Sequence, residues 1–299
     1  MRKIVITGAD GFIGRNLIRG FLKDDCLIYA VVRNRKKSFF KNEKRVRKVL
    51  CDLEHIMELH NLINDAGMDV FYHLAWEGSA GALRSDYEKQ LANAKYTCDA
   101  ALESRRLHCK RFISTGTITE KIVPDAINNN YQSENLIYAI AKDTTHNLLN
   151  MICKKNHIDY CWVQLSNIFG GDNRNGNLIS YTLEEIKAGR VPEYGPCDQY
   201  YDFLYINDAI EGLIKIGFSE RCRECYFVGS GRPRILREYI ELIADKLNER
   251  VAIGKRQGDG VIYQREWFDS TQLRMELGFV PYYTFESALD EVLWSYKQR

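Results

Sequence analysis

Short hydrophobic runs and longer amphipathic stretches alternate along the first half of the chain. Runs rich in β-branched and aromatic residues stand at 4–6, 27–32, 69–75, 111–115 and 159–165, and stretches with helical spacing separate several of them. This alternation is typical of βαβ units, in which helices cover both faces of a parallel sheet. The pattern therefore predicts an α/β fold built on a doubly wound parallel sheet.

Two of the predicted helices are long. In the stretch 86–104 the apolar residues fall on a single helical stripe, and a second helix is predicted from Tyr138 onward. The stripe consists of Leu91, Ala94, Cys98, Ala101 and Leu102. Beyond about residue 170 the pattern loosens into a polar loop at 172–177 and further helices at 178–189, 236–247 and 285–296. We therefore expect a smaller, interleaved lobe at the C-terminal end.

Composition narrows the class of protein. The chain has 299 residues, 45% of them hydrophobic, and 42 Lys and Arg against 40 Asp and Glu give a net charge of +2. These values fit one large domain, or a domain with a smaller lobe, and give no reason to expect a nucleic-acid partner. No apolar run approaches the roughly 20 residues that span a bilayer. The nine cysteines are scattered, so we expect reduced thiols, no metal site, no membrane partner and a cytoplasmic location.

A glycine-rich turn directly follows the first predicted strand. Gly8, Gly11 and Gly14 have G-x-x-G-x-x-G spacing and open the first helix. Such a turn lets the backbone approach a pyrophosphate, and the helix start offers free N–H groups and a positive dipole end. The turn 8–14 therefore predicts dinucleotide binding in a Rossmann-type sheet.

The residues after the second strand favour NADP over NAD. An NAD site usually carries an acidic residue about 20 residues beyond the glycines, to bind the ribose 2′-hydroxyl. The stretch 26–42 contains no acid, and Arg33, Asn34 and Arg35 follow the strand. A guanidinium there suits a 2′-phosphate. We expect NADP as cofactor, with NAD as the alternative.

A proton-transfer pair is predicted at the start of the second long helix. Tyr138 and Lys142 stand four residues apart, on one helix face, and Thr115 lies near the end of the strand before them. Moving a tyrosine pKa from about 10 to about 7 requires about 4 kcal/mol. One positive charge at ~4 Å in an effective dielectric of ~20 supplies about that much. The alternative interpretation is a surface Tyr–Lys pair beside a strand-capping Thr.

In these motifs the chain resembles the extended short-chain dehydrogenase/reductases, in the epimerase/dehydratase group that acts on nucleotide sugars. The resemblance covers nearly the whole chain and implies a Rossmann-type doubly wound parallel sheet with a smaller C-terminal substrate-binding lobe. On this basis we assign residues 1–168 and 199–228 to the dinucleotide-binding domain, and 169–198 and 229–299 to the lobe.

The family motifs also assign roles to individual residues. The resemblance implies that the catalytic residues are Thr115, Tyr138 and Lys142. The cofactor-binding residues it implies, together with those predicted above, are Gly8, Asp10, Gly11, Phe12, Ile13, Gly14, Arg33, Asn34, Arg35, Asp52, Leu53, Leu74, Ala75, Trp76, Asn93, Tyr138 and Lys142. The substrate-binding candidates are Glu77, Thr117, Asn167, Arg174 and Tyr201.

Departures from the family pattern narrow the reaction. Gly116 and Thr117 occupy the place of the Asp-Glu pair of sugar 4,6-dehydratases, and Thr117 also replaces the Cys base of reductases that first epimerise C3 and C5. Both reactions are therefore disfavoured. Gln164 and Leu165 stand where the family usually has an Arg. Tyr201 stands where a further Arg, which binds the substrate diphosphate, is usual; Arg174, Arg232 or Arg234 are its possible replacements.

Three functions remain open at this point. The first is an NADPH-dependent nucleotide-sugar 4-ketoreductase, the second a 4-epimerase that holds NAD tightly, and the third a non-catalytic NADP-binding sensor. The resemblance further implies a homodimer through a four-helix bundle formed by helices 86–104 and 138–154 of two chains.

Overall fold

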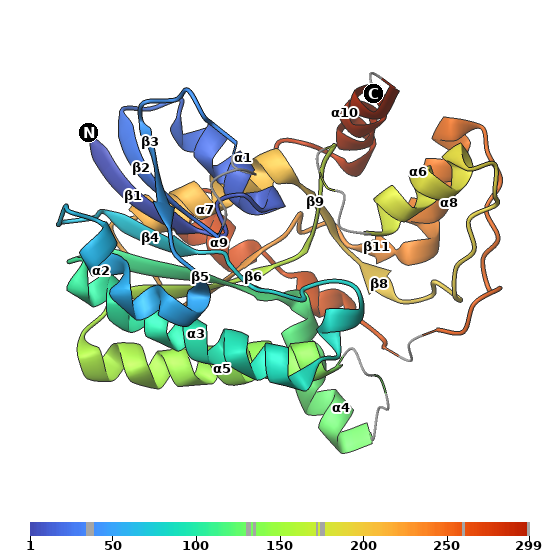
Figure 1. Cartoon of the computed structure of the whole chain (residues 1–299). Helices are drawn as coiled ribbons and strands as arrows, with labels where there is room; N and C mark the ends of the chain where they lie inside the picture. Colours follow the sequence, from blue (N-terminus) through green and yellow to red (C-terminus); the bar gives the residue numbers. More distant parts are fainter. Residues whose placement is uncertain are drawn as a thin grey trace.

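The computed structural model describes residues 1–33, 39–129, 133, 136–171, 173, 177–258 and 261–297. A seven-stranded sheet runs through the larger part of the molecule, with strand order β10-β6-β5-β4-β1-β2-β3 and every pairing parallel (Figure 1). Its strands are β1 (Arg2–Thr7), β2 (Cys26–Val32), β3 (Val46–Leu50), β4 (Val70–His73), β5 (Arg111–Thr117), β6 (Tyr160–Leu165) and β10 (Cys225–Val228). The predicted α/β class and Rossmann-type sheet are confirmed.

Helices cover both faces of this sheet (Figure 1). On one face α1 (Phe12–Phe21) packs against α7 (Ile206–Phe218), and on the other α3 (Tyr87–Arg106) packs against α5 (Leu136–Asn156). Each face has its own hydrophobic core, because the β-branched and aromatic strand residues alternate between the two sides. Shorter helices on this part of the chain are η2 (Leu53–Glu58), α2 (Leu59–Leu62), η3 (Ala82–Arg84), η4 (Ile118–Ile122) and α4 (Val123–Asn129).

A smaller unit with a separate core lies beside the carboxyl ends of the strands (Figure 1). Aromatic rings fill much of this core, and Phe203 lies 5.0 Å from Tyr239 and 5.2 Å from Phe285 between ring centroids. Its elements are β7 (Asn167–Phe169), α6 (Leu178–Lys187), β8 (Tyr200–Tyr201), β9 (Phe203–Tyr205), β11 (Arg234–Ile235), α8 (Leu236–Leu247), η5 (Arg265–Phe268) and α10 (Phe285–Lys297). The exact division of the chain between the two units stays a prediction.

Several elements differ from the sequence-based expectation. The edge strand β3 and the helices α7 and α9 (Thr271–Leu277) were not predicted from the sequence. Leu273 of α9 is buried in the core of the large sheet, although its segment was assigned to the lobe. On α3, Ala94, Cys98 and Ala101 are buried as predicted, but Leu91 is 60% exposed. Across the described residues, no helix is both long and apolar enough to cross a membrane.

Candidate active site

The glycine turn lies where the strand order of the sheet reverses, between β1 and β4. Gly8 adopts φ +66°, and a side chain there would meet the main chain of Ala75 at 2.8 Å. A Cβ on Gly14 would meet the Gly8 carbonyl at 2.2 Å. Gly11, the N-cap residue directly before α1, has no side chain to bond the free N–H groups of the first turn. This close-packed, uncapped helix start fits a dinucleotide pyrophosphate.

A cavity of about 1040 Å³ runs from this turn along the ends of β2 and β4. Asp52 lines it and accepts a 2.7 Å hydrogen bond from the Leu53 main chain. The predicted cofactor residues among its lining are Gly8, Asp10, Gly11, Arg33, Asp52, Leu53, Leu74, Ala75, Trp76 and Asn93. Asn34 and Arg35 lie outside the described residues, so their predicted role is untouched by the structure.

Glu77 lies on the cofactor side and not on the substrate side where we expected it. It lines the cavity of Asp52, pairs with Lys89 at 3.2 Å and with Arg33 at 3.4 Å, and is missing from the lining of the cavity that contains Tyr138. The amide of Asn93 fixes this position, because it donates to the Glu77 carbonyl at 2.7 Å and accepts from the Glu77 N–H at 3.0 Å. These two hydrogen bonds from Asn93 to the Glu77 main chain explain the difference, and the sequence motif did not indicate them.

A second cavity, of about 620 Å³, shares Gly8, Gly11, Leu74 and Trp76 with the first. It brings the three predicted catalytic residues together and extends into the lobe. The predicted residues that line it are Gly8, Gly11, Phe12, Ile13, Gly14, Leu74, Trp76, Thr115, Thr117, Tyr138, Lys142, Asn167 and Tyr201. The two cavities therefore adjoin each other along these shared residues.

Tyr138 and Lys142 are both buried on α5, but they do not form the simple pair expected from the sequence. The ammonium of Lys142 donates to the Thr115 carbonyl at 2.6 Å and lies 3.7 Å from the ring centroid of Trp76. Burial lowers the pKa of Lys142, and the nearby Glu120 carboxylate raises it in part. Burial raises the pKa of Tyr138 to about 12. The expected lowering of the Tyr138 pKa by Lys142 is not found, because burial of the phenol outweighs the lowering by the nearby Arg84 cation.

Arg84, which the sequence motifs missed, faces Tyr138 from the turn before α3. Its guanidinium lies 4.5 Å from the centroid of the Tyr138 ring, and Trp76 meets the same ring edge-on at 6.2 Å. Among the described residues that line this cavity, Arg84 and Lys142 are the cationic ones. No family motif covers Arg84, so only the folded structure shows that it contacts Tyr138.

A buried carboxylate supports the strand end behind the catalytic residues. Glu120 accepts hydrogen bonds from the Thr117 N–H at 2.6 Å, the Gln164 amide at 2.8 Å and the Trp162 indole at 2.9 Å. Burial raises the pKa of Glu120, and these donors oppose the rise. Gln164 stands where the family usually has an Arg. In the structure its side-chain amide donates a hydrogen bond to Glu120.

The lobe side of the cavity carries amides and aromatic rings. Asn167 lines the cavity and donates to the main chain of Asp202 at 3.2 Å, and Tyr201 lies 6.1 Å from Tyr263 between ring centroids. Arg174 lies outside the described residues, and Arg232 and Arg234 are missing from the lining. The part of the site that the structure describes on this side is therefore uncharged.

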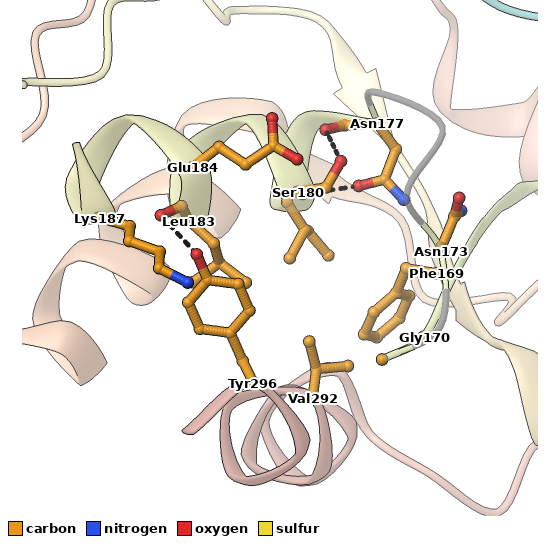
Figure 2. A pocket seen from close by; sticks show the side chains of 12 residues that line it. Phe169, Gly170, Asn173, Asn177, Ser180, Leu183, Glu184, Lys187, Val292 and Tyr296 are labelled. Carbon is orange, nitrogen blue, oxygen red and sulfur yellow. Dashed lines mark hydrogen bonds between the residues drawn. The ribbon is translucent and has the colours of Figure 1, made fainter. Parts of the chain in front are cut away.

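A third cavity, of about 320 Å³, lies between α6 and α10 (Figure 2). Figure 2 shows Tyr296 donating to the Leu183 carbonyl, at 3.2 Å, and Asn177 bonded to the first turn of α6. Asn173 and Asn177 line both this cavity and that of Tyr138. None of the predicted catalytic residues lines it, so we keep it apart from the candidate active site. Within the described residues, no cluster of three or more His, Cys, Asp or Glu is placed to hold a metal ion.

Comparison with known proteins agrees with this geometry. Residues 4–221 match the model of the NAD dependent epimerase/dehydratase family. The chain belongs to this family. The match begins in β1, ahead of the glycine turn, and covers Thr115, Tyr138 and Lys142, and membership supports an enzymatic function that depends on NAD-type cofactors.

Relatives in the family carry different reactions in their names. The chain is 24% identical to CDP-abequose synthase of Salmonella muenchen over 81% of this chain and 80% of that protein. It is 22% identical to dTDP-4-dehydro-6-deoxyglucose reductase of Escherichia coli over 98% of this chain and 96% of that protein. Its fold is similar to that of UDP-glucose 4-epimerase of Thermotoga maritima, with a TM-score of 0.81, 17% identity and 99% coverage of both chains. These relatives support a nucleotide-sugar enzyme, without fixing its reaction.

Proposed function

We propose that this family member is an NADPH-dependent 4-ketoreductase of a nucleoside-diphosphate sugar. The observation that carries the proposal is the single cavity lined by Thr115, Tyr138 and Lys142, which adjoins the glycine turn. A phenol, a hydroxyl and an ammonium thereby surround one space beside the cofactor site. The fold alone would not support this assignment, since the same fold serves several reactions.

In the proposed reaction, side chains of this protein donate the proton and orient the substrate oxygen that receives it. When bound, a nicotinamide cofactor would supply the hydride that reduces the carbon of the C4 carbonyl. Tyr138 donates its phenolic proton to the carbonyl oxygen, and Thr115 aligns that oxygen by a hydrogen bond. Lys142 holds the end of β5 through the Thr115 carbonyl and stabilises negative charge in the site. Thr115, Tyr138 and Lys142 are all buried, and burial strengthens electrostatic interactions between them and a bound group.

The absence of dehydratase groups supports reduction over elimination. A Cβ on Gly116 would lie 2.2 Å from the Trp162 indole nitrogen and 2.4 Å from a Glu120 carboxylate oxygen. The position of the dehydratase acid is therefore filled by neighbouring side chains, and an acid cannot enter without rearrangement.

The proposed cofactor is NADP, with NAD as the alternative. Arg33 lines the cofactor cavity and directly follows β2, in place of the acid that an NAD site would carry. The side chain of Arg33 is 65% exposed, and its guanidinium pairs with Glu77 at 3.4 Å. The guanidinium is therefore accessible to a phosphate. Asp52 also lines this cavity, next to Leu53, on the side where we expect the adenine ring.

Two other functions are separated from the reductase by simple observations. A 4-epimerase would use the same residues with tightly bound NAD, and the UDP-glucose 4-epimerase named above has a similar fold. A non-catalytic sensor would not need the buried Tyr138 and Lys142, both of which line the cavity. We therefore rank the epimerase second and the sensor third.

We also propose a cytoplasmic homodimer. Apolar side chains lie exposed on α3 and α5, the helices that would form a four-helix bundle between two chains. They are Tyr87, Leu91, Ile140, Leu148 and Met151. Helices that expose such residues side by side are typical of a covered surface.

The cofactor content of the purified protein tests the proposal. The reductase is expected to purify without stoichiometric nicotinamide cofactor, and to oxidise added NADPH when given 4-keto forms of nucleoside-diphosphate sugars. Stoichiometric bound NAD with no oxidation of added NADPH would contradict the reductase proposal and favour the epimerase. Binding of NADP without turnover on the whole substrate panel would favour the sensor.

A further inference from the structure

Arg84 has a place in the active site that no sequence motif explains. It ends the short helix η3 and presents its guanidinium to the face of the Tyr138 ring at 4.5 Å, within cation–π range. The Nε atom of Arg84 is buried and has no hydrogen-bond partner among the described residues. Leaving a buried donor unpaired is costly, so packing alone does not account for an arginine here.

Lys142, the other cation that lines the described part of the cavity, does not lie over the Tyr138 ring as Arg84 does. Lys142 donates to the Thr115 carbonyl and rests on the Trp76 ring, and both contacts occupy its ammonium. Trp76 is itself fixed, because its indole N–H donates to Gln90 at 2.8 Å. Arg84 is thus the cation that faces the phenol directly.

The charges around the phenol act in opposite directions. Burial raises the pKa of Tyr138, the Arg84 cation lowers it, and the Glu120 carboxylate raises it. Lys142 lies on the same helix as Tyr138, and its own pKa is lowered by burial and raised by the Glu120 carboxylate. When Tyr138 gives its proton to a substrate oxygen, a buried phenolate forms, and it needs a fixed positive charge nearby.

We propose that Arg84 is a positioning residue for Tyr138, which orients the phenol by stacking on its ring and stabilises the phenolate left after proton transfer. This inference rests on the proposed function for its role in turnover, but the effect on Tyr138 itself is a property of the ligand-free protein. The proton that leaves Tyr138 goes to the substrate oxygen, and solvent returns a proton to the phenolate after release of the product.

A fluorinated tyrosine placed at position 138 tests the inference without any substrate. Its ionisation is followed by fluorine NMR in proteins that carry Arg84, Arg84→Met or Arg84→Lys. Arg84→Met is expected to raise the pH of ionisation by about 1 to 3 units, the usual effect of one opposite charge at this distance. Arg84→Lys keeps the positive charge but not the planar stacking on the ring. In this variant the fluorinated tyrosine is expected to ionise at a pH closer to that of the protein with Arg84.

A matched control is Arg256→Met, because Arg256 lies over the ring of Tyr181 at 4.9 Å, in the lobe. It should leave the ionisation at position 138 unchanged. The inference is overturned when Arg84→Met ionises at the same pH as the parent, or when Arg256→Met produces an equal shift. If Arg84→Met does not fold, a large shift in Arg84→Lys, which retains the charge, would also contradict the proposal.

Turnover separates this inference from the proposed function. Retained turnover in Tyr138→Phe would remove the proposed function and leave the NMR result standing. An unmoved NMR titration, with turnover lost in Tyr138→Phe, would remove the role of Arg84 alone.

Discussion

The ammonium of Lys142 donates a 2.6 Å hydrogen bond to the main-chain carbonyl of Thr115. This bond joins α5 to the carboxyl end of β5, and Tyr138 lies one helical turn before Lys142. The contact therefore fixes the phenol relative to the strand end on which the proposed aligning hydroxyl stands.

Removing the negative charge of Glu120 is expected to change the pH dependence. Burial lowers the pKa of Lys142, and the Glu120 carboxylate raises it, while His146 lies 3.9 Å from the same carboxylate. In Glu120→Gln the ammonium loses this support, so its pKa falls further and its charge is lost at lower pH. The alkaline decline of kcat/KM, which reports the free enzyme, should move to lower pH.

The control for this prediction is Glu103→Gln, a second buried carboxylate. Glu103 accepts from the His60 main chain at 2.6 Å and is absent from the lining of the catalytic cavity. Its substitution should leave the pH profile in place. An unchanged alkaline decline in Glu120→Gln would show that Glu120 does not support the charge of Lys142.

Gly116 is expected to tolerate no side chain. A Cβ there would lie 2.2 Å from the Trp162 indole nitrogen, and Glu120 occupies the other side. Gly116→Ala should lower the free energy of unfolding by about 1 to 3 kcal/mol, the usual cost of overpacking. Gly195→Ala is the control, because its nearest neighbour would lie at 3.4 Å, and it should change stability by less than about 0.5 kcal/mol. Equal denaturation midpoints for the two variants would contradict the packing argument.

Arg33 is expected to set the preference for NADPH. Loss of one charged hydrogen bond to a 2′-phosphate costs about 1.5 to 3 kcal/mol, or about a 10- to 100-fold weaker binding. Arg33→Ala should weaken NADPH by that factor and leave NADH binding nearly unchanged, as measured by titration calorimetry. Arg190→Ala, which breaks a surface pair with Glu185 in the lobe, is the control. Equal losses for both cofactors would argue against a 2′-phosphate site at Arg33.

The exposed apolar face of α3 and α5 is expected to hold two chains together. Leu91 is 60% exposed and Met151 61% exposed, and charges at both positions would be buried in a dimer. The double variant Leu91→Glu with Met151→Glu should sediment as a monomer at micromolar concentration, where the parent sediments as a dimer. Met275→Glu, on a 76% exposed side chain of α9, should remain dimeric. A parent protein that sediments as a monomer would contradict this proposal.

The fold could be predicted to the extent that local patterns determine it. The strands from β1 to β6 that carry contiguous apolar runs were found, because buried parallel strands need such runs on both faces. β3 was missed, since only Val46 and Val49 of its five residues are buried and charged residues lie between them. As an edge strand it has a neighbour on one side only, so its sequence carries little of the signal.

The candidate site shows the same limit. Motif positions brought Thr115, Tyr138 and Lys142 to one cavity, because strand ends of a parallel sheet meet there. Arg84 was missed, and Glu77 lies outside the cavity of Tyr138, since each position is set by a contact with a residue distant in the sequence. The pKa of Tyr138 was misjudged for a related reason: the sequence shows the neighbouring cation but not the depth of burial.

Turnover of 4-keto nucleoside-diphosphate sugars with NADPH, compared between the parent, Tyr138→Phe and Tyr160→Phe, tests the central claim most directly. Tyr160 is a second buried tyrosine, whose hydroxyl has no partner among the described residues, and it lies outside the catalytic cavity. We predict that Tyr138→Phe lowers kcat by about 10²- to 10⁴-fold with NADPH binding retained, and that Tyr160→Phe leaves kcat unchanged. A Tyr138→Phe protein that reduces the sugar as fast as the parent would contradict the account.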